Sequence, residues 1–198
     1  MMKPKFNMTK EQNIFVAKRN IFDYIFKSAK LEGLSVTFPE TDVVVNHGYV
    51  NQGMGLDSVL TINNLKNAWR FMLDSLDVPL DITYLSYLNK HVGEGQLIYG
   101  SRKIRTLPVT IRGTTYEPKI PYAEMIKSDL DNFQKIENPT DRAIITMLYC
   151  MRGQFFIDGN KRTVMLAANK EMIRSGQGII SVPVEKLKNS FVFMKRMI

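Results

Sequence analysis

A glycine followed by an amide and two cations, Gly159-Asn160-Lys161-Arg162, marks a place in this sequence where an anion could bind. A glycine at the start of a helix lets the backbone approach a ligand, because no side chain stands in the way. The first N–H groups of a helix have no partner within it, and the helix dipole adds partial positive charge there. Lys161 and Arg162 add two full positive charges. These four residues therefore predict a site for a phosphate group.

Asp158 comes directly before this glycine and would repel a phosphate unless a cation lay between the two. Carboxylate oxygens suit Mg²⁺, which proteins commonly hold with one or two carboxylates and the phosphates of a substrate. The same residues also fit a plainer structure, in which Asp158 or Asn160 caps a helix and both basic side chains lie in solvent. In either case we expect a helix to begin at about residue 160.

Most of the chain has the apolar spacing of α-helices, which predicts a mainly α fold in a single domain over residues 1–198. Thr9 and Gln12 can form a capping box, Asp81 can cap a second helix, and Gly33 and Gly176 are typical helix ends. We expect residues 39–56 to be irregular. The predicted helices cover about residues 9–33, 62–76, 81–92, 122–136, 140–151 and 160–174, with 184–198 as a further candidate.

A short β-like run, Leu107-Pro108-Val109-Thr110-Ile111, interrupts the helical pattern. The pair Arg112-Gly113 can turn the chain, and residues 114–116 can return along it. The sequence therefore predicts one small β-hairpin at about residues 106–117.

The chain carries 27 basic and 19 acidic residues, a formal net charge of +8. This charge favours anionic partners such as nucleotides, although solubility alone would explain it equally well. No dense basic block occurs, which argues against nucleic acid as a partner. The single cysteine, Cys150, lies in an apolar run and suits a core position in a reducing compartment. Because no stretch of about 18 apolar residues occurs, we expect no membrane span and a cytoplasmic protein.

The residues from 156 to 162 resemble the signature of the Fic family, His-x-Phe-x-Asp/Glu-Gly-Asn-Gly/Lys-Arg-x-x-Arg. Three further regions are similar to this family in the same order along the chain. Residues 28–33, Ser-Ala-Lys-Leu-Glu-Gly, resemble its N-terminal inhibitory motif, residues 88–91 resemble a helix end, and residues 107–116 resemble its flap hairpin. The resemblance covers roughly residues 9–176. The matching signature positions are Phe156, Asp158, Gly159, Asn160, Lys161 and Arg162.

The resemblance implies a helical bundle with a hairpin flap that transfers AMP from ATP to a hydroxyl of a protein target, on Ser, Thr or Tyr. It implies that Asp158 holds Mg²⁺, that Gly159 and Asn160 hold the α- and β-phosphates partly through backbone N–H groups, and that Arg162 grips the phosphates. The flap would hold the target as an added strand. Self-association is a further possibility. The implied flap residues are Leu107, Val109, Thr110 and Ile111, and the implied inhibitory residues are Ser28, Glu32 and Gly33.

The sequence departs from the family at two positions and shows a less common residue at a third. Gln154 stands where the family has the histidine that takes a proton from the target hydroxyl, and an amide cannot hold an extra proton. Met165 stands where many relatives have a second arginine, so Glu32 would lack that partner and could pair with Arg162 or Lys161 instead. Lys161 also occurs in the related Doc toxins, which transfer a phosphoryl group.

Four functions follow from these residues. The leading one is an AMP transferase whose activity is weakened by Gln154, and Gln154 is either natural or introduced. The others are an inactive nucleotide-binding regulator, a Doc-like phosphotransferase, and a helical interaction module. Asn169, on the same helix as Arg162, is a candidate brace for the motif loop, or simply an exposed polar residue.

Overall fold

The computed structural model describes residues 2–49, 53–95, 102–111 and 114–186. Within these ranges the chain is mainly α, as predicted from the sequence. Eight α-helices, one π-helical turn (η1) and one 3₁₀ turn (η2) are seen there. They are α1 Lys10–Arg19, α2 Ile21–Leu31, α3 Phe38–Asp42, η1 Val43–His47, α4 Leu56–Asp74, α5 Ile82–Gly93, α6 Ala123–Phe133, α7 Pro139–Gly153, α8 Asn160–Arg174 and η2 Val184–Lys186.

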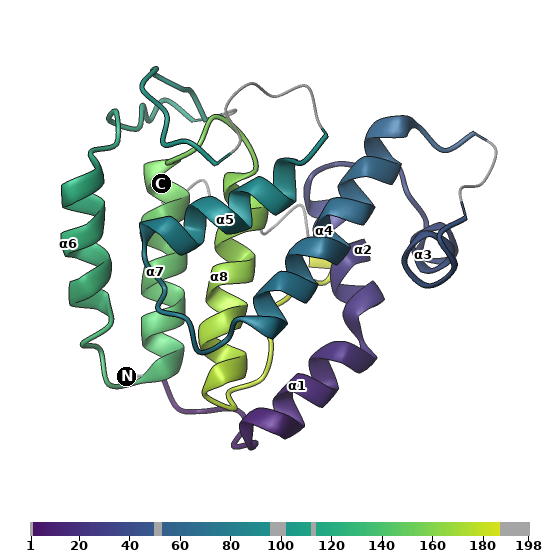
Figure 1. Ribbon diagram of the computed structural model, residues 1–198, viewed down its shortest axis with the longest axis horizontal. Coiled ribbons are helices and arrows are strands. Elements are labelled where there is room, and N and C mark those ends of the chain that lie inside the picture. Colours follow the sequence, from purple (N-terminus) through teal and green to yellow (C-terminus); the bar gives the residue numbers. More distant parts are fainter. Residues whose placement is uncertain (1, 50–52, 96–101, 112–113, 187–198) are drawn as a thin grey trace.

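The helix α8 lies at the centre of the molecule. It runs beside α7 in the opposite direction, with α6 on the far side of α7, while α5 and α4 cross in front of this layer (Figure 1). Every residue of α8 except Lys161 and Arg174 is buried. A helix buried on all sides holds its two ends in fixed places, and the end that begins at Asn160 carries the candidate site.

The predicted capping signals are confirmed at α1 and α5. Thr9 and Gln12 form a reciprocal capping box, and Asp81 accepts a hydrogen bond from the Tyr84 N–H. The prediction of one helix over residues 9–33 was wrong, because the chain breaks at Asn20 into α1 and α2. The Asn20 side chain donates to the Val16 carbonyl at 2.9 Å, and such local bonds compete with helix continuation.

Residues 39–56 are more regular than expected. Thr37 and Glu40 form a second capping box, Pro39 occupies the first turn, and α3 continues directly into η1. An apolar pattern needs several turns to be recognised in a sequence, and α3 is too short to show one.

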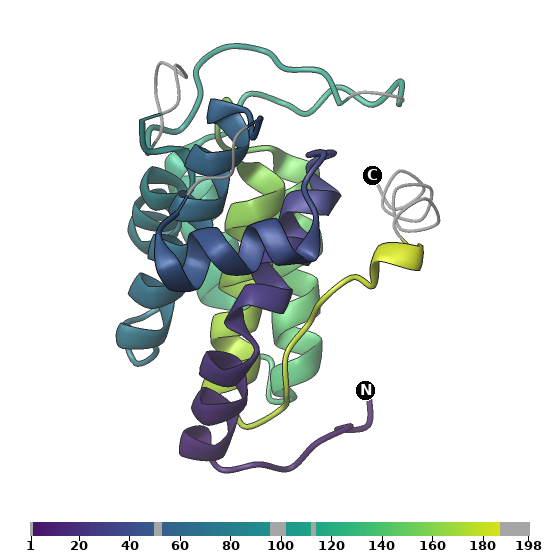
Figure 2. The ribbon, with the colours of Figure 1, turned by 90° about the vertical axis from the view of Figure 1, so that its right-hand side faces the viewer.

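The segment that precedes α6 lies over the end of the bundle where α7 ends and α8 begins (Figures 1 and 2). No strand is seen in residues 102–111 or 114–121, so the predicted hairpin flap is not shown, and its turn, residues 112–113, lies outside the described ranges. The predicted C-terminal helix is represented by η2 alone, since residues 187–198 lie outside them too. Among the described helices, none combines the length and apolarity needed to cross a membrane.

Candidate functional site

The loop between α7 and α8 is held in shape from within by Asn160. The side-chain Oδ1 of Asn160 accepts from the Phe156 N–H at 3.0 Å, and its Nδ2 donates to the Phe156 carbonyl at 2.6 Å. Phe156 itself is 2% exposed and anchors the loop in the core. The Asn160 side chain is therefore committed to the loop, and only its backbone N–H is available to a ligand.

Gly159 adopts a left-handed conformation at the start of α8, with φ of +75°. A Cβ atom at this position would lie 3.0 Å from the side chains of both Asn89 and Val92. Both the conformation and the close approach favour glycine. The first backbone bond of α8 runs from the Thr163 N–H to the Gly159 carbonyl at 2.9 Å. The first N–H groups of α8, such as that of Asn160, therefore precede the helical bonding pattern, and the start of the helix is suited to an anion.

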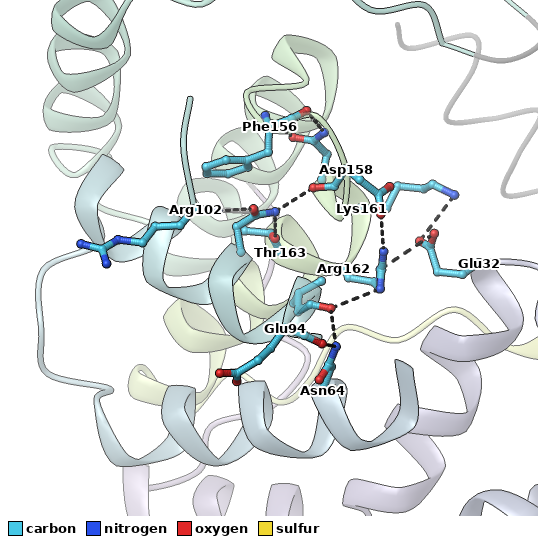
Figure 3. A network of polar contacts seen from close by, with 12 residues as sticks. Glu32, Asn64, Glu94, Arg102, Phe156, Asp158, Lys161, Arg162 and Thr163 are labelled. Carbon is cyan, nitrogen blue, oxygen red and sulfur yellow. Dashed lines mark hydrogen bonds and ion pairs between the residues drawn. The ribbon is translucent and has the colours of Figure 1, made fainter. Parts of the chain in front are cut away.

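Arg162 lies in the floor of this site, and its side chain is 6% exposed. Its Nη2 donates to Asp158 Oδ2 at 2.9 Å and its Nη1 donates to the Val92 carbonyl at 3.3 Å, as Figure 3 shows. Its Nε is buried and makes no hydrogen bond to any described residue. A guanidinium normally offers donors in a rigid fork, so this group retains hydrogen-bonding capacity.

Glu32 reaches the same guanidinium from α2, far away in the sequence (Figure 3). Its carboxylate lies 3.5 Å from Lys161 Nζ and 4.0 Å from Arg162 Nε. Glu32 Oε1 is buried and makes no hydrogen bond to a described residue. The pairing suggested as an alternative to the missing second arginine is thus present, but its distances are loose. A charge-assisted hydrogen bond would measure about 2.7–2.9 Å.

The other two inhibitory-motif positions lie at the end of α2. Gly33 has φ of +84° and ends the helix, which places Glu32 at its C-cap. Ser28 lines a small cavity together with Trp69 and Met165, of about 20 Å³. Met165 is 8% exposed, so its position is filled by packing rather than by an ion pair.

Gln154 ends α7 in a left-handed conformation, with φ of +45°. Its side-chain Nε2 donates to the Met151 carbonyl at 2.6 Å, so the amide caps α7. Left-handed backbone is uncommon for residues other than glycine. The bond to Met151 is one local compensation for it.

Arg105 joins the motif loop to the segment before α6. It is 2% exposed, and its guanidinium donates only to backbone carbonyls among the described residues, those of Gly153, Gln154, Leu107, Pro118 and Lys119. Its own N–H donates to the Phe155 carbonyl at 2.9 Å.

The implied flap residues lie on this same segment, beyond Arg105. Leu107 is 63% exposed. Thr110 is exposed, and Val109 and Ile111 are half-buried. The carbonyls of Leu107 and Ile111 already accept hydrogen bonds, from Arg105 and Thr114.

Sequence reasoning missed three residues of this site: Arg105, Asn89 and the side chain of Asn160. Asn89, on α5, donates from Nδ2 to the Asp158 carbonyl at 2.8 Å. Two sequence features pointed to the neighbourhood of Asn89: the resemblance of residues 88–91 to a helix end of the family, and the glycine-rich stretch after α5. Neither predicted its contact with the motif loop. The expectation that Asn169 braces the motif loop was wrong, since its amide bonds both the N–H and the carbonyl of Ile180.

One exposed carboxylate is available to a metal ion here. Asp158 is 45% exposed, and only its Oδ2 is engaged by Arg162. The described residues contain no cluster of three or more His, Cys, Asp or Glu that could hold a metal alone. This arrangement fits a Mg²⁺ ion that is shared with phosphates and water, and does not fit a closed protein metal site.

Comparisons with a family model, with sequence relatives and with solved structures agree with the family resemblance seen in the sequence. Residues 79–172 match the Fic/DOC family. The protein adenylyltransferase fic-1 of Caenorhabditis briggsae is 25% identical over 178 residues, which make up 85% of this chain and 35% of that protein. The protein adenylyltransferase Fic of Drosophila grimshawi is 25% identical over 190 residues, 90% of this chain and 38% of that protein. The chain thus spans little more than a third of the length of these relatives.

Two solved structures share the fold. Fic-1 from C. elegans aligns with a TM-score of 0.79 and 22% identity, over 90% of this chain and 56% of that one. A Fic-domain signaling protein from Bacteroides thetaiotaomicron aligns with a TM-score of 0.78 and 17% identity, over 89% of this chain and 71% of that one. Residues 79–172 are therefore identified as a Fic/DOC family region, and the sequence relatives and the helical fold agree with this identification over most of the chain.

Proposed function

We propose that this chain binds ATP with Mg²⁺ at the N-terminus of α8 and is built for transfer of AMP to a protein hydroxyl. One observation carries the proposal: Arg162 is buried at the N-terminus of α8, and its buried Nε makes no hydrogen bond to a described residue. Desolvating such a donor without a partner is unfavourable by about 1–3 kcal/mol or more. A phosphate oxygen would supply the missing acceptor.

Each part of the site has a distinct role in this proposal. The N–H groups of Gly159, Asn160 and Lys161 would hold phosphate oxygens, and Arg162 would add its charge. The free Asp158 oxygen would hold Mg²⁺, whose charge would offset the repulsion between this carboxylate and the phosphates. The exposed backbone at residues 107–111 would receive the target segment.

The chemical step that the fold suits is attack of a target hydroxyl oxygen on the α-phosphorus. A bond forms between these atoms, the bond to the β-phosphate oxygen breaks, and pyrophosphate leaves. The hydroxyl proton needs an acceptor, and the amide of Gln154 cannot take it. We therefore propose that the unaltered chain binds nucleotide but transfers AMP about 10²–10⁴ times more slowly than a chain with a general base at position 154.

Glu32 forms part of the same proposal as a brake. A phosphate at Arg162 would place negative charge close to the Glu32 carboxylate, which lies 4.0 Å from Arg162 Nε. Nucleotide and Glu32 would then compete for one guanidinium. We also propose the cytoplasm as the compartment, since the buried and unpaired Cys150 suits reducing conditions.

Calorimetry with Mg-ATP tests the site. We expect binding by the unaltered chain and a loss of roughly ten- to hundred-fold in the variant Arg162→Gln, since a hydrogen bond to a charged group contributes about 1.5–3 kcal/mol. Equal affinity in both proteins would remove Arg162 from the site. No binding at millimolar nucleotide, in the unaltered chain or in Glu32→Gly, would remove the site itself and leave a helical interaction module.

Labelled ATP tests the reaction. The variant Gln154→His, supplied with ATP labelled at the α-phosphate, is expected to label itself or a protein target. Label that arrives only from the γ-phosphate would establish phosphoryl transfer instead. No label from either position, with binding intact, would establish a nucleotide-binding regulator.

A further inference from the structure

Asn89 lies on α5 and contacts three separate parts of the chain around the site. It is 1% exposed. Its Nδ2 donates to the Asp158 carbonyl at 2.8 Å and to Thr163 Oγ1 at 3.2 Å, and its Oδ1 accepts from the Arg102 N–H at 3.0 Å. Both Nδ2 donors of this amide and one acceptor position of its oxygen are therefore used by described residues.

The bond to the Asp158 carbonyl fixes the orientation of the Asp158–Gly159 peptide. A peptide unit is planar and trans, so its C=O and N–H groups point to opposite sides. Because Asn89 holds the carbonyl on the α5 side, the Gly159 N–H faces away from α5. Glycine is permissive at this position and could adopt other orientations at little cost. The backbone alone therefore does not fix this N–H group.

Two further contacts show that α5 is a fixed reference for the loop. Asn64, on α4, donates to the Val92 and Glu94 carbonyls at 3.3 and 2.7 Å, which fastens the end of α5. The same Val92 carbonyl accepts from Arg162 at 3.3 Å. The end of α5 thus orients both the guanidinium and, through Asn89, the Gly159 N–H.

We propose that Asn89 is a positioning residue of the phosphate site, which acts by turning the Gly159 N–H toward the bound phosphate. This inference rests on the proposed nucleotide site. It predicts that loss of the Asn89 donor weakens phosphate binding while leaving the nucleoside part and the fold largely as they are.

Asn169 offers a matched control on α8. It is also buried, at 2% exposure, and its amide also bonds the backbone of a distant segment, the N–H and carbonyl of Ile180. It lies three helical turns away from the motif loop by residue count. A substitution that acts only through stability should act similarly at both asparagines, whereas a positioning role is confined to Asn89.

The experiment compares Asn89→Leu with Asn169→Leu in both the unaltered and the Glu32→Gly background. Affinity for Mg-ATP, inorganic pyrophosphate and adenosine is measured by titration, and stability by denaturant unfolding. Asn89→Leu is expected to weaken Mg-ATP and pyrophosphate roughly ten-fold or more, as for a lost charge-assisted bond, with adenosine unchanged. Asn169→Leu is expected to change no affinity by more than about two-fold.

A second measurement needs no variant. In the unaltered chain, the NMR signal of the Gly159 N–H should shift, and its exchange with solvent deuterium should slow, when pyrophosphate is added. A Gly159 N–H signal that does not change while pyrophosphate binds would mean that the peptide faces the other way, and would overturn the inference.

The outcomes separate the two proposals. Mg-ATP binding that is equal in the unaltered chain and in Asn89→Leu overturns the role of Asn89 and leaves the nucleotide site standing. Equal losses of affinity for adenosine and pyrophosphate, or equal losses of affinity in Asn169→Leu, would show that Asn89 only stabilises the fold. Absence of binding in both backgrounds ends the site and the positioning role together.

Discussion

At the C-terminal end of α8, buried charges are held by short bonds, whereas at its N-terminal end Glu32 approaches its cations only loosely. Glu171 accepts from Arg142 at 2.8 Å and from Arg174 at 2.9 Å, and Lys170 donates to the Leu76 and Val78 carbonyls at 2.7 and 2.6 Å. Glu32 lies 3.5 Å from Lys161 and 4.0 Å from Arg162. The charged groups around the two ends of α8 therefore differ in how closely they are paired.

This difference separates charges that build the fold from charges that are held for a ligand. A buried charge is costly unless it is paired and hydrogen-bonded, and at the C-terminal end the chain supplies those partners itself. At the N-terminal end Glu32 Oε1 and Arg162 Nε are both buried without a hydrogen bond to a described residue. Arg174 Nε at the C-terminal end also lacks one, but Arg174 Nη2 donates to Glu171 at 2.9 Å. Substitutions at the C-terminal end of α8 should therefore have their largest effect on the free energy of unfolding. Substitutions at the N-terminal end should have their largest effect on ligand affinity.

The largest effect on stability is expected for Glu171→Ala. Glu171 is 1% exposed, and its removal would leave the Arg142 guanidinium buried without its carboxylate. Breaking a buried pair in this way lowers the free energy of unfolding by about 3–5 kcal/mol. Chemical denaturation of the variant and the unaltered chain at pH 7 measures the difference.

The matched change at the other end of the helix is Asp158→Asn, at a side chain that is 45% exposed. Its partner Arg162 is buried, but the amide oxygen of Asn can still accept the hydrogen bond from Arg162 Nη2, so this variant should lose much less stability than Glu171→Ala. If the two variants lost similar stability, the distinction between the ends of α8 would fail.

The position of α8 could be predicted from the sequence because strong local signals mark both of its ends. Gly159 and Gly176 adopt positive φ values, and the helix bounds match those expected. The break at Asn20 could not be predicted, since apolar spacing continues across it. The outcome there depends on one side chain that bonds its own helix.

The candidate site divides in the same way. The phosphate-facing residues are neighbours in sequence, so their types alone predict an anion site. Their supports, Asn89, Arg105 and Glu32, come from distant segments. The helix α5 packs against α8, α2 packs against α4, which also contacts α8, and Arg105 bonds the motif loop directly. The bond from Arg105 Nε ends on the Gln154 carbonyl, and because every residue has a backbone carbonyl, the sequence does not mark this acceptor.

A smaller effect, visible through pH, is expected at Lys170. Burial lowers the pKa of the Lys170 ammonium from its usual 10.5 to about 8. Between pH 8 and 10.5 the unfolded chain therefore binds a proton that the folded chain has released, so the free energy of unfolding rises with pH in this window. A single group contributes at most about 1.4 kcal/mol per pH unit.

The variant Lys170→Met isolates this contribution, because it removes the charge and keeps an unbranched side chain. Unfolding of both proteins between pH 7.5 and 10 is expected to show a steeper rise for the unaltered chain. Parallel curves would mean that Lys170 titrates normally. The two carbonyl bonds of Lys170 would then fully offset the burial of its charge, which would sharpen the contrast between the two ends.

The smallest effect on stability, and the most informative for function, is expected for Glu32→Gln. Glu32 is 19% exposed in its side chain and only loosely paired, so the free energy of unfolding should change by less than about 1 kcal/mol. Mg-ATP affinity should rise, by roughly three- to ten-fold, because the amide no longer repels a phosphate at Arg162. Glu124→Gln, at an exposed carboxylate in the first turn of α6, is the charge-matched control and should leave affinity unchanged. Equal affinity in Glu32→Gln and the unaltered chain would show that Glu32 is no brake, and its loose contacts would then be surface pairing at the end of α2.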